Sequence, residues 1–190
     1  MDTTPFLAGQ LLIAMPALGD PNFQRTVVLL GAHSLADGAF GLVINRPLKV
    51  ELSEILDELG LDTVEGDPPP VLGGGPVEPG HGFVLFEPGE DIGDEEDLQL
   101  PGGLAVSGST ETLAELAGGR SSSRYSLILG YSGWYPGQLE AEIEDNSWLV
   151  APLTTSIVFE TPHDERWMAA LDSIGVDPGT IVDHGSATPA

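Results

Sequence analysis

The segment from Gly130 to Trp134 (GYSGW) comes nearest to a catalytic pattern in this chain. It approaches the G-x-S-x-G nucleophile elbow, in which two small residues allow a strained turn to lift a serine above a sheet. Trp134 stands where that motif needs its second glycine, so its side chain would block the close approach of strand and helix. We therefore expect a structural turn here, with Ser132 as a nucleophile the weaker alternative.

A serine hydrolase would also need an acid and a histidine downstream of the serine. The sequence offers Glu142 with His163, and Asp183 with His184, but an acidic chain supplies such pairs by chance. The sequence therefore assigns no catalytic residue. A hydrolase-like enzyme or a small-metabolite-binding protein that uses the Gly130 to Trp134 turn, with Ser132 or Glu142 as the reactive group, remains the alternative function.

Metal and cofactor sites have little support in the sequence. There is no cysteine, and the four histidines show neither an i, i+4 pair nor an H-E-x-x-H motif. The glycine run from Gly73 to Pro76 lacks both the G-x-G-x-x-G spacing and the Lys-Ser/Thr ending of a phosphate loop. We expect no metal and no cofactor.

Arg25, Asn45 and Arg46 are polar groups at the ends of predicted strands, in a chain with very few cations. One interpretation is structural, with an arginine paired to Asp20 or Glu142 to fix the turns. The other is a site for a small anionic ligand, because loops at sheet ends are common ligand sites.

Trp134 and Tyr135 lie between glycine and proline, and they are either core residues or an exposed anchor for a partner. The predicted ligand or partner surface combines this aromatic segment with the strand-end polar groups. It consists of Arg25, Asn45, Arg46, Trp134, Gln138 and Glu142.

The charge of the chain is its strongest compositional signal. Six Lys and Arg residues stand against 30 Asp and Glu residues, which gives a formal net charge of −24. Nucleic-acid binding depends on basic residues that displace counterions from phosphates, so direct binding is not expected.

Asp2 stands where a signal peptide would be basic, and no apolar run reaches the length of a membrane span. We expect a cytoplasmic protein without membrane contact.

Hydrophobic patterns predict strands alternating with helices. Strands are expected at 10–14, 26–30, 40–45, 83–86, 104–106, 126–129, 148–150 and 157–159, and helices at 52–59, 110–117, 138–145 and 162–174. This order predicts a layered α/β or α+β domain with a sheet that is at least partly parallel. Residues 1–176 are expected to form one domain with an acidic loop at about 87–103, and residues 177–190 a flexible C-terminal tail.

Several motifs in the right order resemble the AlgH/YqgE family of uncharacterised bacterial proteins, from about Gly9 to Gly175. The segments that carry this resemblance are Met15–Leu18, Asp20–Phe23, Arg25–Val28, His33, Gly41–Pro47, Gly73–Pro76, Gly130–Glu142 and Trp148. The resemblance implies a compact layered mixed β-sheet with flanking helices and a smaller α/β portion.

Some members of that family are labelled transcriptional regulators, and one branch takes its name from a proposed role in regulating exopolysaccharide genes. The resemblance supplies no catalytic residues. Because the charge of this chain opposes DNA contact, a regulatory role would have to act through a protein partner. The sequence therefore favours a non-catalytic interaction or regulatory module.

Overall fold

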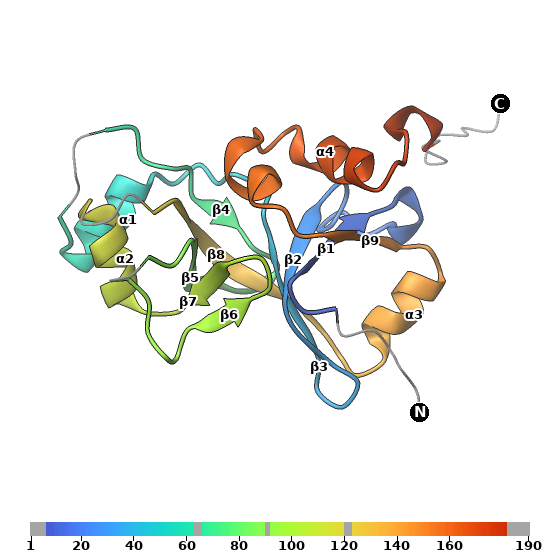
Figure 1. Cartoon of the computed structure of the whole chain (residues 1–190), viewed down its shortest axis with the longest axis horizontal. Coiled ribbons are helices and arrows are strands. Elements are labelled where there is room, and N and C mark those ends of the chain that lie inside the picture. The colour runs from blue at the N-terminus through green and yellow to red at the C-terminus, as the bar shows by residue number, and fades with distance from the viewer. Residues whose placement is uncertain (1–6, 63–65, 90–91, 120–122, 182–190) are drawn as a thin grey trace.

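The computed structural model describes residues 7–62, 66–89, 92–119 and 123–181. In these parts of the chain nine strands form one sheet, with β4 paired to β8 beside the main order β6-β7-β5-β8-β3-β2-β1-β9 (Figure 1). The strands are β1 Gln10–Ala14, β2 Val27–Ser34, β3 Gly38–Val43, β4 Leu72–Gly73, β5 Val77–Phe86, β6 Leu98–Leu100, β7 Leu104–Ser107, β8 Tyr125–Trp134 and β9 Trp148–Pro152.

The α-helices are α1 Leu52–Leu59, α2 Thr110–Ala117, α3 Gln138–Glu144 and α4 Arg166–Ser173, and the short turns are η1 Pro16–Leu18, η2 Ser156–Glu160 and η3 Pro178–Thr180. Only β4 and β8 pair in parallel among the described strands, and the other pairings are antiparallel. The fold is therefore α+β with a mixed sheet, as predicted, but its parallel content is a single short pairing.

Strand β8 is shared by both halves of the sheet. Its first part pairs with β5, and its last residues, from Ser132 to Trp134, pair with β3. The predicted turn at Gly130 to Trp134 is therefore wrong, because the segment continues the strand. Gly130 has φ 76°, and a Cβ there would lie 2.7 Å from the carbonyl oxygen of Gly75. The glycine serves a close approach of two backbones rather than a chain reversal.

The alternation of side chains along β1 separates two cores. Leu11 and Ile13 face the core beneath α4, which includes Trp167. Leu12 and Ala14 face the opposite core, which contains Leu139 of α3 together with Trp134 and Trp148. Helices α3 and α4 therefore cover opposite faces of this half of the sheet.

Helices α1 and α2 cover the other half, around a core that includes Phe86 and Leu127 (Figure 1). Both helices begin and end close to their predicted bounds. Ser109 caps α2 by accepting a hydrogen bond from the backbone N–H of Glu111, and Gly60 ends α1 in the left-handed conformation.

Three sequence expectations differ from the structure. Residues 157–159 were expected to form a strand, but they lie in the π-helical turn η2, where Ile157 and Val158 pack into the core. Helix α4 begins at Arg166, after a turn that starts at Pro162. The expected loose tail forms η3 in its first residues, capped by Asp177. Its last residues, 182–190, lie outside the described part.

The acidic segment that follows β5 is partly ordered by its few apolar residues. Ile92 is buried, and β6 pairs with β7. The carboxylate of Asp97 accepts a hydrogen bond from the backbone N–H of Asp94 at 2.6 Å.

Among the described residues, none of the helices has the length and apolar character to cross a bilayer.

Candidate functional site

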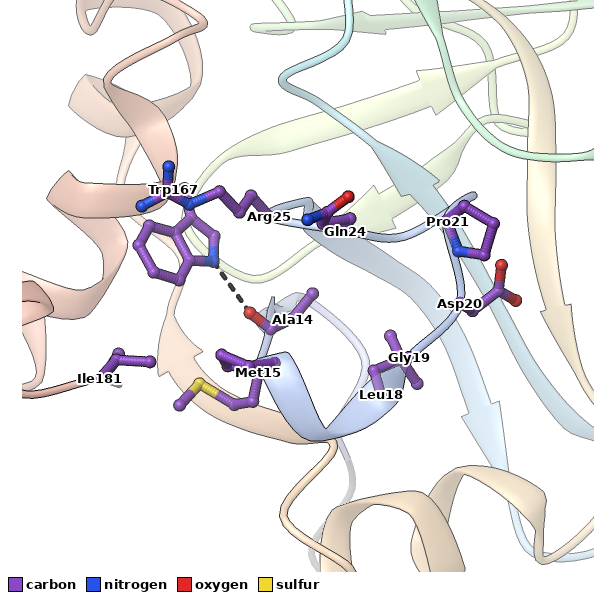
Figure 2. Close-up of a pocket in the computed structure, with 11 residues that line it drawn as sticks. Ala14, Met15, Leu18, Gly19, Asp20, Pro21, Gln24, Arg25, Trp167 and Ile181 are labelled. Atoms are coloured by element: carbon purple, nitrogen blue, oxygen red, sulfur yellow. Dashed lines mark hydrogen bonds between the residues drawn. The ribbon is translucent and has the colours of Figure 1, made fainter. Parts of the chain in front are cut away.

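A cavity of about 380 Å³ opens beside the loop that joins η1 to β2. We call residues 19–25 the Arg25 loop and this opening the Met15 cavity. It is lined by Ala14, Met15, Pro16, Leu18, Gly19, Asp20, Pro21, Gln24, Arg25, Trp167 and Ile181. Figure 2 shows the side chain of Arg25 extending across the indole of Trp167 at one end of the cavity, with Asp20 at the other.

Arg25 is the most unusual residue of this site. Its backbone is left-handed, with φ 55°, which is uncommon for a residue other than glycine. Its guanidinium lies 4.7 Å from the ring centroid of Trp167, a cation–π contact. Within the described residues the guanidinium has neither a hydrogen-bond acceptor nor a carboxylate partner. None of its five N–H donors is used by the part of the chain that the structure describes.

Asn45 fixes the backbone at the end of the Arg25 loop. Its side-chain amide donates a hydrogen bond to the carbonyl oxygen of Arg25 at 2.9 Å. Its side-chain oxygen accepts one from the backbone N–H of Val27, also at 2.9 Å. These two bonds flank Thr26, the residue after the left-handed Arg25, and they fix the carbonyl group of Arg25 where the loop enters β2.

Arg46 organises the rest of the loop. Its guanidinium donates hydrogen bonds to three backbone carbonyls, those of Pro21, Asn22 and Gln24. Burial lowers the pKa of Arg46 and the nearby Asp20 carboxylate partly offsets this effect, so the side chain keeps its charge. Of the predicted partners, Asp20 thus lies near Arg46, and neither Asp20 nor Glu142 pairs with Arg25.

Helix α4 is fixed to the sheet by two adjacent side chains. Trp167 donates a hydrogen bond from its indole Nε1 to the carbonyl oxygen of Ala14 at 2.9 Å. Arg166 is buried and donates to the carbonyl oxygens of Ile44 and Thr161. Burial lowers the pKa of Arg166, but the two carbonyls satisfy its charged form.

A second cavity of about 240 Å³ is also lined by Arg25 and Trp167. We call it the His163 cavity. It is lined by Gln24, Arg25, Asn45, Arg46, His163, Asp164, Trp167 and Met168. Gln24, Arg25 and Trp167 line both cavities, so a ligand in either one can meet the same guanidinium. The structure therefore brings the three predicted strand-end groups together.

The other three predicted residues form a separate network that runs from the buried Trp134 through the half-buried Glu142 to the exposed Gln138. The carboxylate of Glu142 accepts hydrogen bonds from the indole Nε1 atoms of Trp134 and Trp148, at 2.9 and 2.8 Å. Its second oxygen accepts one from Gln138 at 2.9 Å. Trp134 is only 6% exposed, so its predicted role as an exposed anchor is wrong, whereas Tyr135 is 83% exposed. Glu142 anchors two core indoles.

Phe23 connects the two groups. Its ring lies 6.2 Å from the ring centroid of Trp134 and 5.6 Å from that of Trp148. Phe23 belongs to the Arg25 loop, two residues before Arg25 itself. A movement of this loop therefore bears directly on the indole pair.

The candidate hydrolase set of Ser132, Glu142 and His163 is not assembled. Ser132 is fully buried and donates its hydroxyl hydrogen bond to the carbonyl oxygen of Gly74 at 3.0 Å. Glu142 lies on α3 and His163 beside α4, on opposite faces of the sheet. Asp183 and His184 lie outside the described residues. In the part of the chain that the structure describes, no three metal-ligating side chains cluster.

Sequence reasoning missed both residues that fix α4. Trp167 was predicted only as part of the apolar face of a helix, and its contact with Arg25 joins segments far apart in the chain. Arg166 carried one usable signal, since a basic residue next to a core tryptophan needs acceptors once it is buried.

Comparison with known proteins places this arrangement in a family. A family model described as AlgH-like matches residues 11–179. The chain belongs to the AlgH-like family. A UPF0301 protein of Magnetococcus marinus is 43% identical over 183 residues, covering 95% of this chain and 97% of the relative. One from Methylococcus capsulatus is 45% identical over 174 residues, covering 90% and 91%. The resemblance noted from sequence motifs is confirmed.

Two solved structures of similar proteins share the architecture of this AlgH-like chain. The solution structure of the AlgH protein from Pseudomonas aeruginosa aligns with a TM-score of 0.75 at 40% identity, covering 93% of each chain. A crystal structure of a Corynebacterium diphtheriae protein aligns with a TM-score of 0.69 at 23% identity, covering 90% of this chain and 88% of the other. The second likeness concerns the fold alone.

Proposed function

We propose that this AlgH-like protein is a non-catalytic regulatory module that binds a small organic anion at Arg25. The observation that carries the proposal is the free guanidinium of Arg25. In a chain of net charge −24, a cation with an unused set of donors would ordinarily be paired with a carboxylate. Arg25 is instead held on an aromatic ring at the mouth of a cavity.

The Met15 cavity supports a ligand with an apolar body. Met15, Leu18 and Ile181 supply apolar walls, and the volume of about 380 Å³ is within the range of small-molecule sites. The negative group of the ligand would meet Arg25. Asp20 at the other end would disfavour a second negative charge there.

The regulatory part of the proposal rests on the Arg25 loop. A ligand that engages Arg25 also contacts the loop that carries Phe23, which packs on Trp134 and Trp148. A change in that loop alters the surface that a protein partner would meet. We infer an indirect regulatory role through such a partner, because the acidic chain is unsuited to DNA.

A thermal-shift screen of small organic carboxylates, sulfonates and phosphates tests the proposal. We expect at least one compound with an apolar body to raise the Tm of the wild-type protein, and Arg25→Gln to abolish that shift. Glutamine keeps a Cβ at the left-handed position, so the substitution changes the charge without changing the backbone strain. Lys49→Gln removes the same charge from another exposed position, and the compound should raise the Tm of this variant as it raises that of the wild type.

Equal shifts in Arg25→Gln and the wild type would overturn the proposal. Ser132→Ala addresses the enzymatic alternative, because it leaves the Met15 cavity intact. Turnover of any compound that disappears in this variant while the fold persists would favour a hydrolase over a binding module.

A further inference from the structure

The charges around the His163 cavity are unlike those of the rest of the molecule. Arg25 and Arg46 line it, and the buried Arg166 lies just behind it, bonded to the carbonyl oxygen of Ile44. These are three of the six basic residues of the whole chain. Asp164 is the only carboxylate among the residues that line the cavity. The cavity is thus a local concentration of positive charge on a strongly negative protein.

Hydrogen-bond donors are also in excess at this cavity. Among the described residues, no acceptor engages the five N–H groups of Arg25, and Arg46 uses three of its five on the Arg25 loop. His163 forms no hydrogen bond through its ring with any described residue. These donors come from three directions: the end of the Arg25 loop, the segment after β3, and the turn before α4.

The position of His163 is built into the fold. Arg166 donates to Thr161 on one side and to Ile44 on the other, so it ties the turn that carries His163 to the strand end that carries Arg46. The turn itself is closed by a hydrogen bond from the backbone N–H of Glu165 to the carbonyl oxygen of Pro162 at 2.9 Å. The backbone that carries His163 is therefore tied to the strand end that carries Arg46 before any ligand arrives.

We infer that the His163 cavity binds a phosphate group, and that the ligand of this protein is a small phosphorylated compound with an apolar body. This inference rests on the proposed function, since it assigns the chemical class of the anion that Arg25 meets. A phosphate has three terminal oxygens and up to two negative charges, so it can use donors on Arg25, Arg46 and His163 together. A carboxylate has two oxygens, which Arg25 alone can satisfy in a bidentate pair.

The two cavities give such a ligand its orientation. They share Gln24, Arg25 and Trp167, so the phosphate occupies the His163 cavity while the apolar body reaches the Met15 cavity across the Arg25 stack. The reversed orientation would leave the phosphate with Arg25 as its charged donor, because Arg46 and His163 line the His163 cavity and do not line the Met15 cavity.

Isothermal titration with phenyl phosphate and benzoate tests the assignment, since the two probes share a ring and differ in the anionic group. We expect the wild-type protein to bind phenyl phosphate about tenfold more tightly than benzoate, because charge-assisted bonds are added. His163→Gln should weaken the binding of phenyl phosphate about three- to tenfold and change the affinity for benzoate by less than about twofold. Arg25→Gln should weaken the binding of both probes.

A second pair of variants changes charge without depending on His163. Asp164→Asn removes the carboxylate from the cavity, and we expect it to strengthen phenyl phosphate binding by about three- to tenfold. Asp172→Asn is the matched control, because Asp172 is an exposed residue further along α4 that does not line the cavity. It should leave the affinity unchanged.

Equal affinity of the wild type for the two probes, no binding of either probe, or an Asp164→Asn variant that behaves as Asp172→Asn does would each overturn the phosphate assignment. The proposed function would survive these results if the thermal-shift screen still found an anion whose effect is lost in Arg25→Gln. If that screen found no such anion, both would fail.

Discussion

The side-chain amide of Asn45 donates a hydrogen bond to the carbonyl oxygen of Arg25 at 2.9 Å. The same side chain accepts one from the backbone N–H of Val27. An unusual backbone conformation persists only where its surroundings over-determine it, and Asn45 supplies that constraint for Arg25. The availability of the guanidinium therefore depends on a neighbour in the sheet.

Replacing Asn45 by alanine should destabilise the protein and loosen the Arg25 loop. Two hydrogen bonds are lost, and we expect the free energy of unfolding to fall by about 1–3 kcal/mol in urea titrations. Asn45→Asp keeps the acceptor for Val27 but loses the donor to Arg25, so its free energy of unfolding should lie between those of Asn45→Ala and the wild type. Wild-type stability in Asn45→Ala would show that the loop is held by other contacts.

Glu142 should prove structural. Glu142→Leu leaves the indole N–H groups of Trp134 and Trp148 without their acceptor, and we expect a loss of about 2–4 kcal/mol, with a shift in tryptophan fluorescence. Glu142→Gln retains an acceptor oxygen, so it should lower the free energy of unfolding by less than Glu142→Leu does. Glu144→Gln, at an exposed position of the same helix, should have little effect. A stable Glu142→Leu variant with unchanged fluorescence would contradict this role.

The ion pair between Arg124 and Glu87 should stabilise the fold at neutral pH and cease to do so in acid. The hydrogen bond from Arg124 holds the pKa of Glu87 below its ordinary value of 4.5. A carboxyl whose pKa is lower in the folded state contributes stability above its unfolded pKa, and this contribution is lost as pH falls through the folded pKa. The difference in stability between wild type and Arg124→Gln should therefore be largest near pH 7 and shrink below about pH 4.5. A difference that stayed constant from pH 7 to about pH 3 would argue against this linkage.

Gly130 should not tolerate a side chain. A Cβ there would lie 2.7 Å from the carbonyl oxygen of Gly75, and the residue has φ 76°. We expect Gly130→Ala to lower stability by at least about 2 kcal/mol, measured by thermal unfolding. Gly80→Ala is the control, because a Cβ at Gly80 has no neighbour within 4 Å. Equal stability of the two variants would refute the close-approach account.

Local patterns were sufficient for most of the elements. The apolar spacing of Leu52, Ile55 and Leu56 at i, i+3 and i+4 predicts α1, and Ser109 or Thr110 as a cap predicts the start of α2, because both signals lie within a few residues. The π-helical turn η2 was mistaken for a strand, since Ile157 and Val158 favour strands and only tertiary packing opposes that preference. Gly130 was mistaken for a turn residue because its requirement comes from a distant segment, at Gly75.

Only part of the candidate site could be predicted, because local patterns identify single residues and do not record contacts between distant segments. Arg25, Asn45 and Arg46 stand out as scarce cations and strand-end polar groups, and they do meet. The contact of Arg25 with Trp167, and the cavity that Arg25, Asn45 and Arg46 share with His163, join segments more than a hundred residues apart, which no local pattern records. The sequence left both a core role and an exposed role open for Trp134, because the contact of its buried indole with the half-buried Glu142 is set by tertiary packing.

Because β8 is bonded to β5 through one part of its length and to β3 through the other, neither half of the sheet can lose its structure alone. The chain should melt in a single cooperative transition, even though its helices cover separate cores. The amide protons at the centre of β8 should accordingly exchange with solvent only when the whole molecule opens.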